Sequence, residues 1–314
     1  YSKARMHGRF LVTVHDEINI SVPRQYLESE MAVLKRAMES VVADGKPFIV
    51  LNGADGGWKQ PQPFILFALY ASALDGVVVM GGLNEYYSFR HYTAVRLERP
   101  ESNFVDVNPF VADENFGDAA IGWVMARVAG ALARNRILGR SHAVFLLVHQ
   151  IEALAKSSGG NKAKKRTTID SLFALPPDVI GDGEKVFAMQ LGLFRKYQSG
   201  IEAIARDYGV KSAYFFHPVP AWGKTLTEVE KQRAGDLSYG PLYRRMVDAM
   251  LRQRDQGLAV FDLGDMLKDV KETIYADGAH FDRAWYTGES LGYTLMAQRV
   301  AADLARAWNL QRKP

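Results

Sequence analysis

The sequence predicts an α/β fold in which helices cover both faces of a parallel sheet. Short apolar runs rich in β-branched residues alternate with longer segments whose apolar residues recur at helical spacing. Turn residues such as Gly, Pro, Asn and Asp bound the short runs, as is typical of buried strands. Because this alternation is characteristic of strands joined by crossover helices, we predict a three-layer α/β/α sandwich with a five-stranded parallel sheet.

The five predicted strands occupy residues 9–14, 47–51, 76–80, 212–216 and 258–262. Between the first two, Pro23 is suited to open a helix, because its fixed φ angle and missing N–H fit the first helical turn. Residues 26–45 then carry apolar side chains at spacings of three and four, and Gly45 supplies a stop. The first two strands and this helix are expected to form one βαβ unit.

Two more helices are predicted near the C-terminal end, at about 243–254 and over 288–310. The region from about 100 to 182 departs from the alternation, because it contains two helical patterns with no strand between them. We therefore expect a single domain over residues 1–314, with a helical insertion at about 100–182.

Composition argues against several classes of site and partner. The absence of cysteine excludes a disulfide, a thiolate metal site and a cysteine nucleophile. No apolar run approaches the roughly 20 residues of a spanning helix, so no transmembrane segment is expected. The net charge of +4 is small, and the one basic run, at 162–166, has the Gly- and Ser-rich flanks of a solvated loop. We therefore expect no nucleic-acid partner.

Glycine-rich and polar blocks follow three of the predicted strands. They are GADGG at 53–57, GGLNE at 81–85 and DGAHF at 277–281. Trp58 follows the first block, and His217 ends the fourth predicted strand. In open parallel sheets ligands bind at the carboxyl ends of the strands, so we expect these blocks to meet at one edge of the sheet.

These blocks resemble those of the SGNH, or GDSL-type, hydrolase family, and the resemblance extends over most of the chain outside the insertion. Asn84 matches the family's oxyanion-hole asparagine, while Asp277 and His280 match its orienting carboxylate and its base. Gly57 is the best match to the family's oxyanion glycine, with Gly53 as the second choice. The resemblance implies a flavodoxin-like strand order, no cofactor, and activity as an esterase or an O-acyl carbohydrate hydrolase.

The family's nucleophile block follows the first strand, and here that position reads HDEI. Aligned without a gap, Glu17 stands where the family has its serine. A carboxylate beside His280 would favour the imidazolium form, which is a poor base. A pseudoenzyme that binds a glycan or an acylated ligand is therefore the second function that the sequence allows. Two further hypotheses are that Ser21 or Ser2 is the nucleophile, and that Glu17 itself acts as a base or a nucleophile.

Rings near the predicted strand ends are candidates for contact with a small-molecule or glycan ester. They are His15, Trp58, Tyr86, Tyr87 and His217. Aromatic side chains at such an edge suit stacking on a sugar or an acyl group, and they equally suit packing beneath the insertion. No set of residues has the spacing of a known metal motif, so no metal site is expected. The start at Tyr1 and the family branch together favour an extracytoplasmic location.

Overall fold

The computed structural model describes residues 9–13, 41–43, 46–47, 49–53, 58–91, 93–99, 172–282 and 290–312. The chain divides into two compact units, one formed by Tyr1–Thr93 with Asp178–Pro314 and the other by Ala94–Pro177. In the second unit, Val95 and Ala174 form an antiparallel bridge. The two helical patterns predicted within the insertion lie outside the described residues. The first unit contains the sheet.

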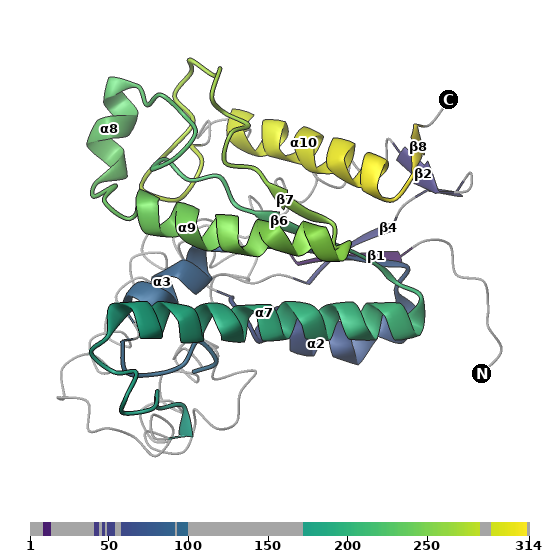
Figure 1. Cartoon of the computed structure of the whole chain (residues 1–314). Helices are drawn as coiled ribbons and strands as arrows, with labels where there is room; N and C mark the ends of the chain where they lie inside the picture. The colour runs from purple at the N-terminus through teal and green to yellow at the C-terminus, as the bar shows by residue number, and fades with distance from the viewer. Residues whose placement is uncertain are drawn as a thin grey trace, which may run out of the picture. The chain divides into compact units, whose positions relative to one another are not determined.

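The main sheet is parallel, with the strand order β4-β1-β5-β6-β7. Figure 1 labels β1, β4, β6 and β7 of this sheet. Its strands are β1 (Arg9–Thr13), β4 (Ile49–Asn52), β5 (Gly76–Gly81), β6 (Lys211–Phe216) and β7 (Val260–Asp262). Gly81 lies opposite Phe216, and Phe216 lies opposite Asp262, so three neighbouring strands end level with one another. A mixed α/β fold with a parallel sheet is therefore confirmed.

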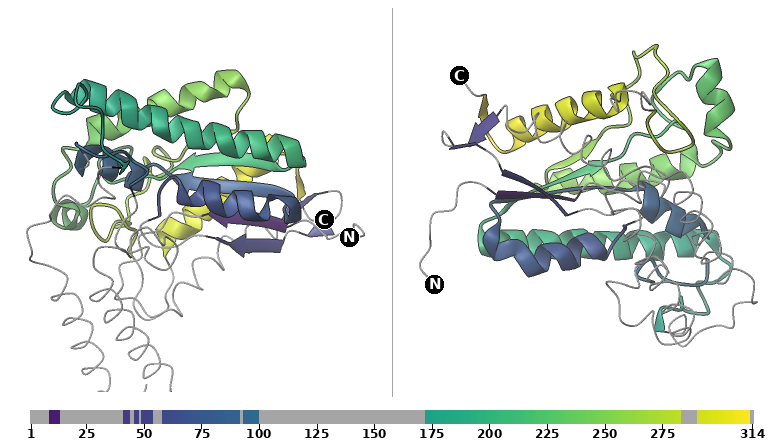
Figure 2. Two further views of the ribbon diagram at one scale, coloured as in Figure 1. Left: turned by 90° about the horizontal axis from the view of Figure 1, so that it is seen from below. Right: turned by 180° about the vertical axis from the view of Figure 1, so that it is seen from behind.

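Both faces of the central strands are covered by helices (Figure 2). Val78 and Met80 of β5 share a buried cluster with apolar residues of α10 (Leu291–Ala307). On the other face, Phe216 of β6 packs edge-on against Phe194 of α7 (Gly183–Tyr208), with ring centroids 6.1 Å apart. Every residue of β5 is buried, which explains why its sequence is an unbroken apolar run rather than an alternating one.

The remaining described α-helices are α2 (Gln62–Tyr70), α3 (Leu83–His91), α8 (Glu228–Ala234) and α9 (Gly240–Leu251). The helices α9 and α10 overlap in sequence with those predicted at 243–254 and 288–310. The 3₁₀ turn η5 (Arg252–Gln256) continues α9. The other helices, including the long α7, were not predicted from the sequence. None of the described helices has both the length and the apolar character required to cross a bilayer.

The prediction of a helix over residues 26–45 is wrong at its C-terminal end, because Val41–Ala43 form the strand β2. This strand pairs antiparallel with β3 (Lys46–Pro47) and with β8 (Gln311–Arg312) in a second, small sheet. The β-branched Val41 and Val42 suit a strand. Their partner β8 comes from the far end of the chain, so helical spacing within one segment gives no sign of the pairing.

The second predicted strand also needs a correction at its start. Pro47 belongs to β3 of the small sheet, and the strand of the main sheet begins two residues later, at Ile49. Pro23 lies outside the described residues, as does most of the helix that it was predicted to open.

Candidate functional site

A tight turn brings Asp277 and His280 into direct contact. The ring nitrogen Nδ1 of His280 lies 2.7 Å from Oδ2 and 2.9 Å from Oδ1 of Asp277. The same Oδ1 accepts hydrogen bonds from the backbone N–H groups of Ala279 and His280, each at 2.8 Å. With the proton on Nδ1 facing the carboxylate, the neutral ring presents Nε2 as its basic nitrogen. The carboxylate of Asp277 therefore orients both the ring and the backbone of His280.

Hydrogen bonds across the base of the turn fix its shape. The N–H of Ala276 donates to the carbonyl of His280 at 2.8 Å, and Tyr275 forms an antiparallel bridge with Phe281. Gly278 lies at the tip, where an added Cβ would stand only 2.8 Å from the carbonyl oxygen of Ala234. A glycine is required there because the neighbouring atom is backbone and has little freedom to move.

The charge state of Asp277 suits an orienting role. Partial burial by itself raises the pKa of this carboxyl, but the hydrogen bonds from the His280 ring and from backbone N–H groups outweigh burial and lower the pKa below its ordinary value. Asp277 is therefore ionised near neutral pH. An ionised carboxylate holds Nδ1 as the protonated nitrogen of the ring and stabilises an imidazolium that forms on it.

Asn84 lies in the first turn of α3, which follows directly from β5. Its side-chain nitrogen Nδ2 donates to the carbonyl of Trp58 at 3.1 Å. The neighbouring Glu85 carboxylate accepts from the backbone N–H of Gly82 at 2.8 Å and from that of Gln60 at 3.0 Å. The start of α3 therefore holds the backbone at residues 58–60, next to the predicted glycine loop.

The chain turns sharply between β5 and α3, and Gly82 makes this turn possible. Its φ angle is +108°, a value that residues with a side chain rarely adopt. An added Cβ would also lie 2.7 Å from Cδ1 of the Phe216 ring. Gly82 thus sets the direction in which α3 leaves the sheet, and with it the position of Asn84.

Two tyrosines at the start of α9 connect the helix of Asn84 to the backbone of Gly278 and of His217. The ring of Tyr239 lies 5.7 Å from that of Tyr86 on α3, and its hydroxyl donates to the carbonyl of Gly278 at 2.8 Å. The ring of Tyr243 packs edge-on against Tyr86 at 5.8 Å, and its hydroxyl donates to the carbonyl of His217 at 2.7 Å. A short series of contacts therefore links the helix of Asn84 to the turn of Asp277 and His280.

His217 ends β6 at the same edge of the sheet. Its backbone N–H donates to the carbonyl of Gly81 at 3.1 Å, and its ring stacks on Phe281 with centroids 5.7 Å apart. Because Phe281 directly follows His280, the stacking brings the end of β6 next to the candidate base. His217 is buried, so its ring contributes packing at this edge.

The other predicted ligand-contacting rings differ in exposure. Tyr86 is only 2% exposed and is surrounded by other tyrosines, so its contacts are those of packing. Tyr87 and Trp58 are half-buried. Glu17, His15, Gly57, Ser21 and Ser2 lie outside the described residues, whereas Gly53 follows β4 directly.

Four residues with a part in this arrangement were not predicted from the sequence, namely Tyr239, Tyr243 and, at the base of the Asp277–His280 turn, Lys224 and Glu230. The last belongs to a capping box with Thr227, a pattern that is visible in the sequence as TEVE at 227–230. In the part of the chain that the structure describes, no group of three or more His, Asp or Glu residues is placed to hold a metal ion. Comparison with protein-family models gives no match, and neither does comparison with curated proteins.

Proposed function

We propose that this chain is an SGNH-type hydrolase-like protein, by resemblance an esterase or an O-acyl carbohydrate hydrolase. The proposal includes a three-layer α/β/α sandwich with five parallel strands in a flavodoxin-like order. The observation that carries it is the contact between Asp277 and His280, with Nδ1 and Oδ2 2.7 Å apart. The contact series through Tyr239 to the helix of Asn84 supports it further, because the two motifs are 193 residues apart (277 − 84) in the chain.

In this function each residue has a defined chemical task. Asp277 fixes the ring of His280, whose Nε2 takes a proton from the attacking group and returns it to the leaving alcohol. The amide of Asn84 and the backbone N–H of Gly57 donate to the negative charge that develops on the ester carbonyl oxygen. Overall, water adds across the ester C–O bond, which breaks to give a carboxylic acid and an alcohol.

The second candidate function is binding of a glycan or an acylated ligand without turnover. The observation that favours it is Glu17 at the place of the family's serine. Loss of a triad member costs roughly four or more powers of ten in rate, and a carboxylate near His280 favours the protonated ring. The ligand in both candidate functions is a small-molecule or glycan ester, and the expected location is extracytoplasmic.

Turnover of short-chain nitrophenyl esters and of acetylated sugars by the full chain tests the first function. Hydrolysis that is lost in His280→Ala and kept in Glu272→Gln, whose carboxylate is exposed, supports the hydrolase. Hydrolysis that persists undiminished in both His280→Ala and Asp277→Ala overturns it.

A fluorophosphonate probe and one further variant separate the two functions. Covalent labelling at Ser21 contradicts the pseudoenzyme. If the wild-type chain shows neither labelling nor turnover and Glu17→Ser gains esterase activity, catalysis has been lost on an intact scaffold.

A further inference from the structure

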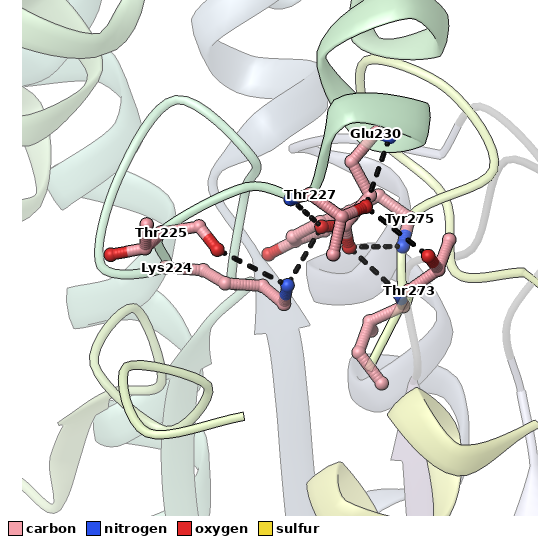
Figure 3. A network of polar contacts seen from close by, with 7 residues as sticks. Lys224, Thr225, Thr227, Glu230, Thr273 and Tyr275 are labelled. Carbon is pink, nitrogen blue, oxygen red and sulfur yellow. Dashed lines mark hydrogen bonds and ion pairs between the residues drawn. The ribbon is translucent and has the colours of Figure 1, made fainter. Parts of the chain in front are cut away.

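A buried ion pair lies outside the catalytic and ligand-contacting residues that were predicted from the sequence. The ammonium nitrogen Nζ of Lys224 is 2.7 Å from Oε2 of Glu230, and both side chains are 0% exposed (Figure 3). Removing two charges from water is costly, and mutual attraction offsets that cost only when further hydrogen bonds satisfy the remaining polar atoms. The contacts of this pair are therefore informative about its role.

The carboxylate of Glu230 accepts hydrogen bonds from three backbone N–H groups. Its Oε2 accepts from Thr227 at 2.7 Å, which completes the capping box of α8. Its Oε1 accepts from Ile274 at 2.7 Å and from Tyr275 at 3.0 Å. Figure 3 shows the side chain between the start of α8 and the loop segment that contains Tyr275. One carboxylate thus joins two segments that are far apart in the sequence.

The segment that Glu230 holds is the base of the turn that carries Asp277 and His280. Ile274 accepts a hydrogen bond from the N–H of Asp282, and Tyr275 bridges to Phe281. Asp277 comes two residues after Tyr275. A shift of the backbone at residues 274–275 would therefore move Asp277 relative to the ring of His280.

We infer that Glu230, held in place by Lys224, is a positioning residue for the Asp277–His280 pair. The inference rests on the proposed function, in which this pair contacts the reacting group or the bound ligand. Only an ionised carboxylate supplies acceptors for three N–H groups and an ammonium group at once. A glutamine at the same position has one acceptor oxygen and brings an NH₂ group against donors.

Glu230→Gln tests the inference, with Glu272→Gln as the matched control because that carboxylate is exposed and lies two residues before Ile274. The first readout is the pKa of the Asp277 carboxyl, which is measured by ¹³C NMR on the full chain. The hydrogen bond from His280 lowers the pKa of Asp277. If Glu230→Gln displaces Asp277 from the ring of His280, the pKa of Asp277 rises toward its ordinary value. In the control Glu272→Gln it keeps the wild-type value. The second readout is ester turnover, with an expected fall in kcat of about tenfold and little change in KM.

An unchanged Asp277 pKa in a folded Glu230→Gln protein overturns the inference. Should Glu230→Gln not fold, Glu230→Asp keeps the negative charge with a shorter side chain, and the same two readouts apply. If neither variant folds, Glu230 serves the fold alone and the inference is wrong. If turnover depends on His280 but Glu230→Gln leaves the pKa of Asp277 unchanged, only this inference is rejected and the hydrolase function stands. A raised Asp277 pKa in a protein without turnover rejects only the hydrolase function.

Discussion

The side-chain amide of Asn84 donates a hydrogen bond to the backbone carbonyl of Trp58 at 3.1 Å. Asn84 belongs to the block after β5, and Trp58 directly follows the glycine block after β4. Because β1 lies between β4 and β5 in the sheet, the contact joins segments that follow two strands that are not neighbours. The amide therefore has a structural task at the start of α3 in addition to the oxyanion contact that we propose for it.

Asn84→Ala is expected to lower the free energy of unfolding by about 1 kcal/mol, because the part-buried hydrogen bond from the Asn84 amide to the Trp58 carbonyl is lost. It is also expected to reduce ester turnover by about a hundredfold, since the oxyanion loses a side-chain donor. Urea unfolding and ester kinetics measure the two effects, with Glu272→Ala as the control at an exposed position. Full turnover in a folded Asn84→Ala protein would contradict the oxyanion role.

Glu85→Ala is expected to destabilise the protein by about 2–3 kcal/mol, because it leaves two backbone N–H groups without their acceptor. These groups belong to Gly82 and Gln60, and the Glu85 side chain is buried with them. Urea unfolding at neutral pH measures the loss. An unfolding midpoint equal to that of Glu272→Ala would show that the contact does not hold the segment at residue 60.

Acid is expected to destabilise the protein partly through Glu230. Burial by itself raises the pKa of this carboxyl, but the hydrogen bonds from Lys224 and from backbone N–H groups outweigh it and lower the pKa from 4.5 to about 2. Between these values the unfolded chain binds the proton and the folded chain does not, so stability falls as the pH drops from 4.5 toward 2. The loss over this window is about 3 kcal/mol.

Urea unfolding of the wild type, Glu230→Gln and Glu272→Gln at several pH values between about 6 and 2.5 measures this effect. Glu230→Gln should lose the part of the acid dependence in this window that Glu230 contributes, whereas Glu272→Gln should keep the wild-type dependence. Equal pH profiles for the wild type and Glu230→Gln would contradict the lowered pKa.

Much of the main sheet was predictable because each strand is a short apolar run with its own turn residues. The contact of Asp277 with His280 was expected because the Asp-x-x-His block resembles that of the SGNH family, and the two residues are close enough in sequence to meet within one turn. The strand Val41–Ala43 and the role of Glu230 were not, because each depends on a partner far along the chain. A capping box at 227–230 is visible in the sequence, but nothing local shows that Oε1 of the same glutamate bonds the backbone at 274–275.

Tyr239→Phe is expected to loosen the turn of Asp277 and His280 while leaving the packing of the ring on Tyr86 intact. The variant removes only the hydroxyl that donates to the carbonyl of Gly278 at 2.8 Å. We expect a loss of about 1 kcal/mol in the free energy of unfolding, since one part-buried hydrogen bond is removed.

Hydrogen exchange followed by NMR gives the sharper measurement for Tyr239→Phe. The backbone N–H groups of Ala279 and His280 should exchange faster than in the wild type, because both are held by Asp277 next to Gly278. Tyr208→Phe is the matched control, since that ring is 55% exposed at the end of α7, and it should leave both rates unchanged. If the two amides exchange at wild-type rates in Tyr239→Phe, the hydroxyl does not restrain the turn, and the link between the helix of Asn84 and His280 depends on ring packing alone.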